Sequence, residues 1–194
     1  MAFIRIKKIK GHPYAYLVEN RWKGKSSRQK VTGYLGRVVE IPEHNSAPAP
    51  NMSGDYCSCV QEVITWQLAR LGFRQNGALL TKGKLAFSLQ DLHFKQRGKE
   101  GDKNSHISIK NHNGFLCHYT LDSFRGFKPW GSDQETGLAL AKIVVNAGLD
   151  LPKELFVTLF QKAKKNQPED RRGTTILEKR QGNSSNHTIK KESP

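Results

Sequence analysis

Cysteine and histidine side chains are the residues of this chain whose chemistry suits a transition metal. They include Cys57, Cys59, Cys117, His93, His106, His112 and His118. Four such side chains can close a structural zinc site, in which paired cysteines are usually separated by two to four residues. Ser58 alone separates Cys57 from Cys59, and cysteines at a helix start or in a strand are commonly small buried hydrophobes. We therefore predict no metal site and no cofactor.

Carboxylates point to a second kind of chemistry, the cleavage of a nucleic acid. Asp91 and Asp122 lie near histidines in the sequence, and Asp102 lies beside Lys103 in a polar stretch. No nucleophile, base and orienting group can be assigned among them, because single carboxylates in polar loops are normally solvated. Glycine-rich nucleotide motifs and the Gly-x-Ser-x-Gly motif are absent from the sequence. The sequence favours a protein without catalytic residues, and a nuclease stays an alternative.

Basic side chains form the strongest candidate site. The chain of 194 residues has 32 Lys and Arg against 17 Asp and Glu, a formal net charge of +15. Residues 1–43 carry 10 basic and three acidic residues, and residues 161–194 carry nine and four. A polyanion would relieve this self-repulsion and release counterions on binding. The predicted nucleic-acid-binding residues are Arg5, Lys7, Lys8, Lys10, Arg21, Lys23, Lys25, Arg28, Lys30 and Arg37.

Aromatic residues are interleaved with these basic residues. Tyr14, Tyr16, Trp22 and Tyr34 could stack on unpaired bases. The alternative is that they form the core of a small sheet, since a segment of 40 residues has few other large side chains. Both interpretations stay open at this stage.

Alternating apolar and charged side chains place the basic residues on strands. Residues 3–10, 14–22 and 28–41 have period 2, β-branched or aromatic character and short polar turns between them. They predict an antiparallel β-meander, a basic module over residues 1–43. The three prolines of residues 42–51 predict a linker at residues 44–54.

The segment 55–166 predicts a body of mixed structure. A helix begins near Tyr56 and ends at Gly72, short strands follow over residues 73–96, and Asn113-Gly114 marks a hairpin between HISIK and FLCHY. Two further helices, 135–147 and 153–165, form a helical hairpin. The fold class is therefore α+β: a meander, a helix, an antiparallel sheet and a C-terminal helical hairpin. The polar residues 167–194 predict a disordered basic tail.

The helical hairpin offers a further alternative, a helix-turn-helix with Lys153, Lys162, Lys164 and Lys165 on phosphates. Its apolar residues already occupy one face of each helix, as packing on a sheet requires. We therefore predict that this hairpin packs in the body.

The first 40 residues resemble the β-rich N-terminal segment of DDE-type insertion-sequence transposases. The order that carries the resemblance is Phe3-Ile4-Arg5, a Lys-rich turn ending at Gly11, residues 14–19 (YAYLVE), Gly24-Lys25, Arg28-Gln29-Lys30 and Tyr34-Leu35-Gly36. The resemblance covers about a fifth of the chain. It implies a DNA-contacting module without transposition chemistry, because the chain is too short for the catalytic core and lacks three separated catalytic acidic residues.

Together these patterns predict a non-catalytic protein that binds DNA or RNA through the phosphate backbone. The alternatives are an adaptor that binds a protein partner through the 55–166 body, and a nuclease or transposase-related enzyme. Three cysteines and a start without a continuous apolar run predict a cytoplasmic protein with no membrane partner.

Overall fold

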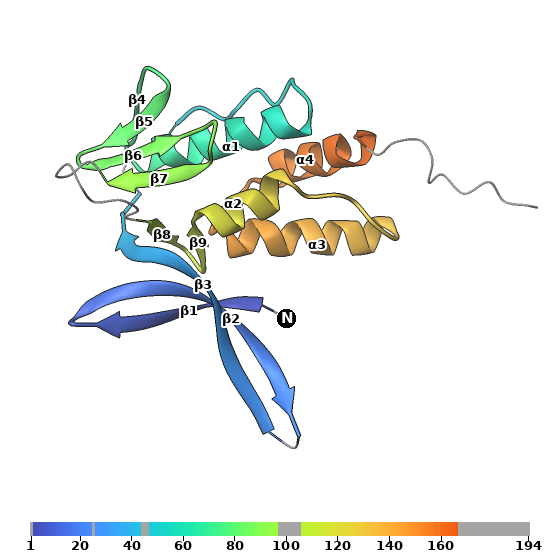
Figure 1. The fold of residues 1–194 in the computed structure, drawn as a ribbon. Helices are drawn as coiled ribbons and strands as arrows, with labels where there is room; N and C mark the ends of the chain where they lie inside the picture. The colour runs from blue at the N-terminus through green and yellow to red at the C-terminus, as the bar shows by residue number, and fades with distance from the viewer. Residues whose placement is uncertain (1, 25, 44–46, 97–105, 167–194) are drawn as a thin grey trace, which may run out of the picture.

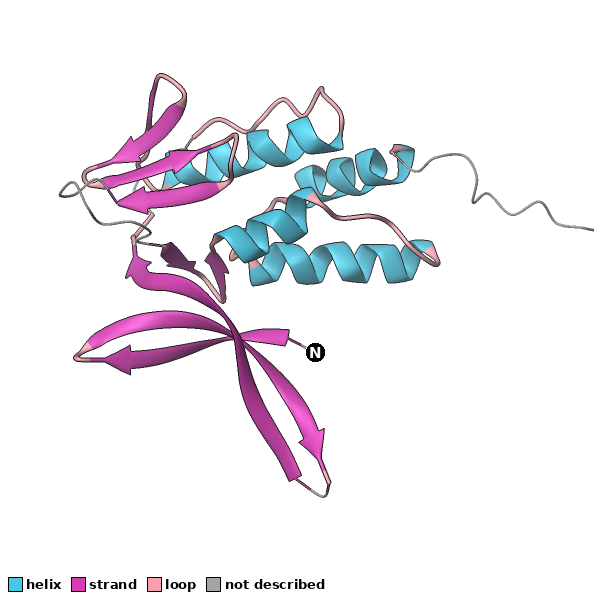
Figure 2. Cartoon of the chain, viewed as in Figure 1, coloured by secondary structure: helices cyan, strands magenta, loops and turns pink. Residues whose placement is uncertain are grey.

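The computed structural model describes residues 2–24, 26–43, 47–96 and 106–166, and it confirms the α+β class (Figures 1 and 2). One sheet has the strand order β1-β2-β3-β8-β9 and a second has β4-β5-β6-β7. The strands are β1 (Ala2–Ile9), β2 (His12–Lys23), β3 (Ser26–Glu40), β4 (Arg74–Asn76), β5 (Leu79–Lys82), β6 (Leu85–Ser88), β7 (His93–Gln96), β8 (Ile107–Asn111) and β9 (Gly114–Leu116). The helices are α1 (Tyr56–Arg70), α2 (His118–Arg125), α3 (Asp133–Asn146) and α4 (Lys153–Lys165).

The predicted meander is present as β1, β2 and β3, which pair antiparallel. β1 pairs with β2 only as far as the Ala2–Glu19 pair, whereas β2 and β3 continue to the Lys23–Ser26 pair. The end of the β2–β3 hairpin is therefore a two-stranded ribbon, and Figure 1 shows it extending away from the rest of the molecule. We call residues 20–30 the distal ribbon.

β3 also joins the meander to the body, because its last residues pair in parallel with β8. Arg37–Glu40 align with Ile107–Lys110, and the Arg37 amide donates to the His106 carbonyl over 2.9 Å. Gly36 has φ +113°, and a Cβ at this position would lie 2.1 Å from the His106 carbonyl oxygen. The predicted division at residues 44–54 did not anticipate this pairing, through which residues 1–43 and the body share one sheet.

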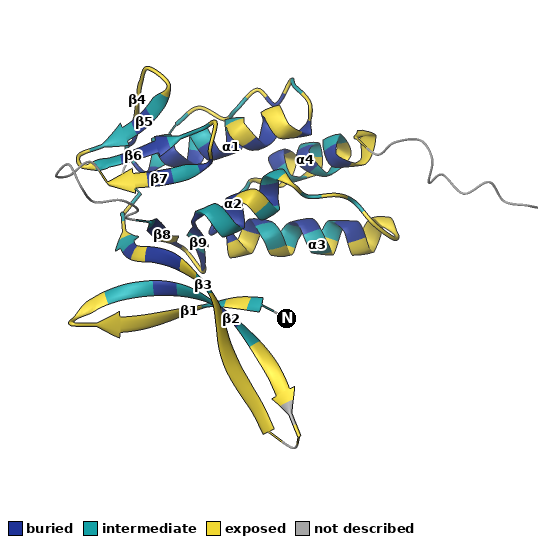
Figure 3. Ribbon diagram, viewed as in Figure 1, coloured by how far each residue is buried: buried dark blue, intermediate teal, exposed yellow. Residues whose placement is uncertain are grey.

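Two hydrophobic clusters hold the chain together. The larger one lies among the helices and the second sheet and includes Ile64, Phe87 and Leu121. The smaller one consists of Ala15, Leu35, Val38 and Cys117, so it lies where the meander meets the start of α2. In Figure 3 burial is concentrated in the body and at this junction, while the ends of the meander are exposed.

α1 and α3 begin at residues whose side chains cap the helix. Asp55 accepts a hydrogen bond from the Ser58 amide at the start of α1, and Ser132 and Glu135 form a capping box at the start of α3. α3 and α4 bury Leu140 and Leu159, so the helical hairpin packs in the body as predicted. None of the described helices is long and apolar enough to cross a membrane.

The hairpin near residue 112 differs in detail from the prediction. Asn111 pairs with Gly114, and the positive φ of the turn lies at His112 (φ 44°) instead of at Asn113-Gly114. The predicted strand FLCHY ends at Leu116, and α2 begins at His118. Thr120 causes this change of structure, because its hydroxyl accepts a hydrogen bond from the Cys117 amide at the helix start.

The predicted linker packs along α1 where it is described. The Trp66 indole donates to the Ala47 carbonyl over 3.1 Å, and the Met52 amide donates to Glu62 over 2.8 Å. Met52 is buried. The tail predicted at 167–194 and residues 44–46 lie outside the described residues.

Replacing Gly36 by alanine tests the close approach of β3 to the body. We expect Gly36→Ala to lower the free energy of unfolding by about 2–4 kcal/mol, since the methyl group meets backbone and the φ angle is strained. Gly137→Ala is the matched control: Gly137 lies inside α3 with its nearest neighbour 3.8 Å away, and alanine there should stabilise by about 0.5–1 kcal/mol. Urea denaturation measures both. Equal, small effects would contradict the contact.

Glu43 makes a second tie between the end of β3 and the body. It accepts hydrogen bonds from Gln67 over 2.7 Å and Arg70 over 2.6 Å, and it lies 3.3 Å from His112 Nε2. Burial alone would raise the pKa of Glu43, but the Gln67 hydrogen bond and the charges of Arg70 and His112 outweigh it and lower that pKa.

The lowered pKa of Glu43 makes the tie depend on pH in a defined direction. The unfolded carboxyl binds its proton at a higher pH than the folded one, so the contribution is full above the ordinary glutamate pKa and is lost as pH falls through the folded pKa. We expect Glu43→Gln to destabilise the protein by about 1–2 kcal/mol at pH 7. Thermal melts should show this difference shrinking below about pH 4. A difference that is constant from pH 7 to pH 3 would contradict the role of the charge.

Candidate nucleic-acid interface

The predicted basic residues lie on the meander, and those whose side chains are described are exposed. These are Arg5, Lys7, Lys8, Lys10, Arg21, Arg28, Lys30 and Arg37. The side chain of Lys23 and residue Lys25 lie outside the described part. The structure divides the exposed set between the β1–β2 turn, one face of the meander and the distal ribbon.

The distal ribbon places two positive charges opposite each other. Arg21 and Arg28 are directly paired across β2 and β3. Like charges in this position destabilise a sheet, and Arg21 has one described ion pair, with Glu19 at 3.8 Å, in which both side chains are solvated. Such a pair is worth little at the surface. The ribbon therefore carries a charge that an external anion would compensate.

One face of the meander combines basic and aromatic side chains. The register aligns Arg5, Tyr16 and Tyr34 across the three strands, and it aligns Lys7 with Tyr14. Directly opposed residues project from the same face, and residues two apart on a strand do so too, so Arg5 and Lys7 lie on one face of the meander. Arg5 and Lys7 also line a pocket of about 280 Å³ with Tyr16.

The tyrosines of this face contact one another. The ring centroid of Tyr34 lies 5.4 Å from that of Tyr16 and 6.3 Å from that of Tyr14. Burial and the neighbouring Tyr14 and Tyr16 raise the pKa of Tyr34, so Tyr34 stays neutral at physiological pH. Trp22, 78% exposed, stands apart from it on the distal ribbon. The small core is instead built from Ala15, Leu35, Val38 and Cys117, so the aromatic residues are not needed as a core.

The β1–β2 turn forms the third basic group. Lys7 and Lys8 lead into it, and Lys10 adopts φ 49° beside Gly11 at φ 79°. Arg37 Nη2 lies 3.2 Å from His12 Nδ1, which brings the last basic residue of β3 to this end of the meander. The turn and the distal ribbon lie at different ends of the crossed strands in Figure 1.

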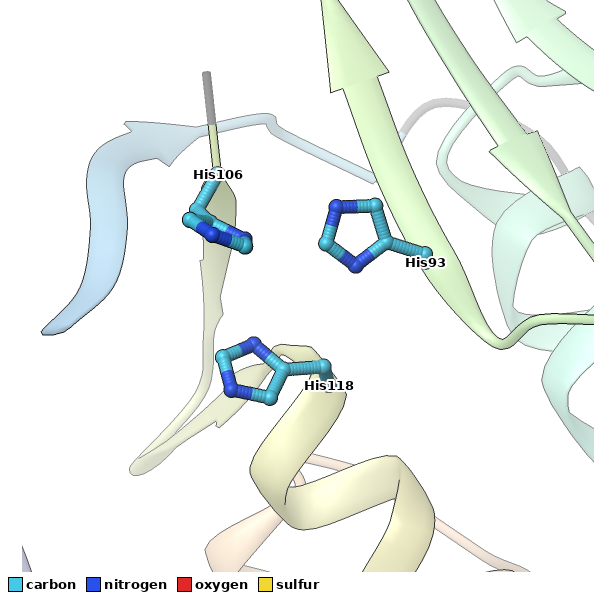
Figure 4. Close-up of side chains that lie close together, drawn as sticks. All are labelled: His93, His106 and His118. Atoms are coloured by element: carbon cyan, nitrogen blue, oxygen red, sulfur yellow. The ribbon is translucent and has the colours of Figure 1, made fainter. Parts of the chain in front are cut away.

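Three histidines from separate segments come together beside the meander. His93 lies in β7, His106 immediately precedes β8 and His118 begins α2, and a ring nitrogen from each lies within 4.8 Å of the others. Figure 4 shows the three rings facing a common space. Cys57 and Cys59 lie instead in α1, and His112 contacts Glu43. All three histidines are among the metal-capable residues named from the sequence. Because 25 positions separate His93 from His118, their spacing along the chain did not indicate a cluster.

The predicted carboxylates have local partners. Asp91 accepts a hydrogen bond from Ser88 over 3.0 Å, and Asp122 accepts one from Arg125 over 3.3 Å. Asp102 lies outside the described residues. The structure thus assigns Asp91 and Asp122 local contacts at a strand end and within a helix.

Comparisons of the chain with protein-family models, with curated proteins and with solved structures found no match. The resemblance of the first 40 residues to the transposase segment remains a prediction.

Neutralising the opposed arginines tests the distal ribbon as an interface. We expect Arg21→Gln with Arg28→Gln to weaken binding to duplex DNA about 10-fold or more and to reduce the slope of log affinity against log salt by about 2. The folded state should be unchanged or slightly stabilised, because a repulsive pair is removed. Fluorescence anisotropy and thermal melts measure the two effects.

The matched control for this variant is Lys153→Gln with Lys165→Gln, which removes the same charge from exposed positions on α4. This control should keep at least half of the affinity. Equal losses in the two double variants would show that only net charge matters and would contradict a local interface.

Proposed function

We propose that this protein binds duplex DNA without catalysis, with the distal ribbon in the major groove and basic side chains on phosphates. The observation that carries the proposal is a two-stranded, positively charged ribbon that is exposed along residues 20–30 wherever side chains are described. A two-stranded ribbon without a third strand or a core is only marginally stable by itself. A ligand that is complementary to both the shape and the positive charge of such a ribbon would give it a function.

The shape favours duplex DNA over duplex RNA. The major groove of B-DNA is about 12 Å wide and admits a two-stranded β-ribbon, whereas the major groove of A-form RNA is deep and narrow. Side chains of the ribbon would reach base edges, while Arg21 and Arg28 would lie near the phosphates of the groove walls. Phosphate contacts of this kind position a protein and do not choose a sequence.

The other basic groups extend the contact surface. Lys7, Lys8 and Lys10 project at the opposite end of the meander, and residues 167–194 carry six basic and four acidic residues. These segments would add phosphate contacts along the DNA and raise the salt dependence of binding. The described cysteines are free, as is common in a reducing compartment such as the cytoplasm.

The resemblance to the transposase segment supports the same proposal, because it implies a DNA-contacting module. The catalytic alternative is weaker, since Asp91 and Asp122 already have local partners. A protein adaptor is the remaining alternative, and the binding experiment below separates it from the proposal.

The experiment measures affinity of the full chain, freed of nucleic acid, for a 20-base-pair DNA, the matching RNA duplex and the single strands over a salt series. We expect the tightest binding to duplex DNA and a log–log slope of about −4 to −6, corresponding to about five to seven phosphates. A preference for duplex RNA would contradict the groove argument. Lack of binding to any of the four ligands at low salt would reject the function and favour the adaptor.

A further inference from the structure

The three-histidine cluster is built from parts of the fold that are otherwise separate. His93 belongs to the four-stranded sheet, His106 leads into the five-stranded sheet, and His118 is the first residue of α2. Ring centroids lie 5.0 Å apart for His93 and His106 and 5.4 Å apart for His106 and His118. Three segments thus place three half-buried imidazoles next to one another. Apolar side chains at these positions would lose less hydration free energy on burial.

The cluster leaves a polar atom without a partner. His106 Nδ1 is buried and has no hydrogen-bond partner among the described residues. A buried polar nitrogen without a hydrogen-bond partner raises the free energy of the folded state, so a ligand that binds it would stabilise the protein. The same atom type is a ready donor to a transition metal.

We propose that His93, His106 and His118 bind one transition-metal ion of the zinc class. Among the described residues, the cluster contains imidazole donors and no carboxylate or thiolate within the same distance limit. Neutral imidazole suits Zn²⁺ and its neighbours in the first transition row, whereas Mg²⁺ and Ca²⁺ need oxygen ligands. Three histidines leave the fourth tetrahedral position to water or another small donor, as in sites that are not closed by protein alone.

The distances between the histidine nitrogens require a small movement of the side chains before they can bind one metal ion. Zn–N bonds of about 2.0–2.1 Å in tetrahedral geometry place the ligand nitrogens about 3.3 Å apart. The three nitrogens now lie within 4.8 Å of one another, so rotations of the side chains on fixed backbone would bring them to the metal. Figure 4 shows no ring turned away from the shared space.

Burial and neighbouring charges act on two of the three histidines. Burial is the first cause that lowers the pKa of His93 and of His118, and the neighbouring His106 lowers both further. Neutral imidazole is the form that donates a lone pair to a metal. Asp91 and Asp122 act in the opposite sense on these two histidines, whereas Lys95 acts on His93 in the same sense as His106.

A metal at this position would fix the junction between the meander and the body. The His106 carbonyl accepts a hydrogen bond from the Arg37 amide, and the ring centroids of His106 and Tyr34 lie 6.1 Å apart. His106 therefore touches β3 at the point where β3 enters the body, while His93 and His118 belong to the second sheet and to α2. The metal would join these three segments, and this role does not depend on the proposed binding of DNA.

Metal titration of the full chain, stripped with a chelator, tests the proposal. Co²⁺ is the spectroscopic probe and Zn²⁺ the competitor. We expect one Co²⁺ per chain with the visible absorption of a four-coordinate nitrogen site, displaced by one equivalent of Zn²⁺. We also expect Zn²⁺ to raise the midpoint of thermal unfolding, because it binds the folded state.

Single variants decide which residues are ligands. His93→Ala, His106→Ala and His118→Ala should each weaken Zn²⁺ binding by about 100-fold or more, and each should lose the thermal shift. His112→Ala is the matched control, since His112 is a half-exposed histidine outside the cluster, and it should bind Zn²⁺ as the parent protein does. Thermal melts without metal should show cooperative unfolding in every variant, because all three side chains are only half-buried; glutamine replaces alanine at any of the three positions that fails this check.

Two results would overturn the proposal. One is a parent protein that binds less than one equivalent of Co²⁺ or Zn²⁺ at 100-fold excess metal. The other is a set of cluster variants that bind Zn²⁺ as tightly as His112→Ala.

Discussion

The parallel pairing of β3 with β8 is the interaction on which the rest of this structure depends. It positions the last residues of a long strand against the body, and the absence of a side chain at Gly36 lets the backbone of β3 reach the His106 carbonyl. The small cluster of Ala15, Leu35, Val38 and Cys117 then fills the space beside this contact. Without the pairing, the meander would have no rigid orientation relative to the helices.

This anchoring explains how the chain tolerates an unfavourable ribbon. Opposed Arg21 and Arg28 repel each other, and every side chain of the distal ribbon that the structure describes is exposed, so burial does not offset the repulsion. The same strands are held firmly nearer the body, where Ala15, Val18 and Leu35 are buried. Stability and charge are therefore separated along β2 and β3: one end of the hairpin packs, and the other is available to a polyanion.

Local signals predicted most of the elements, and long-range geometry supplied what they could not. Period-2 alternation predicted β1, β2 and β3. The starts of α1 and α3 lie within two residues of the predicted positions, and Asp55 and Ser132 cap them through contacts within a few residues. The parallel pairing of β3 with β8 joins residues some 70 positions apart, which no local pattern encodes. α2 was missed because it is short and its cap depends on Thr120 instead of a preferred N-terminal residue. The histidine cluster needed three separate segments in their final places, whereas the exposed basic residues needed only the alternation of a strand.

We propose that the distal ribbon, and not the helical body, contacts DNA. Amide hydrogen exchange of the full chain with and without a saturating 20-base-pair duplex tests this claim most directly, since it reports each segment in one experiment. We expect slower exchange in residues 20–30 and around the β1–β2 turn, with α3 and α4 unchanged. Protection confined to α3 and α4, with the ribbon unchanged, would contradict it.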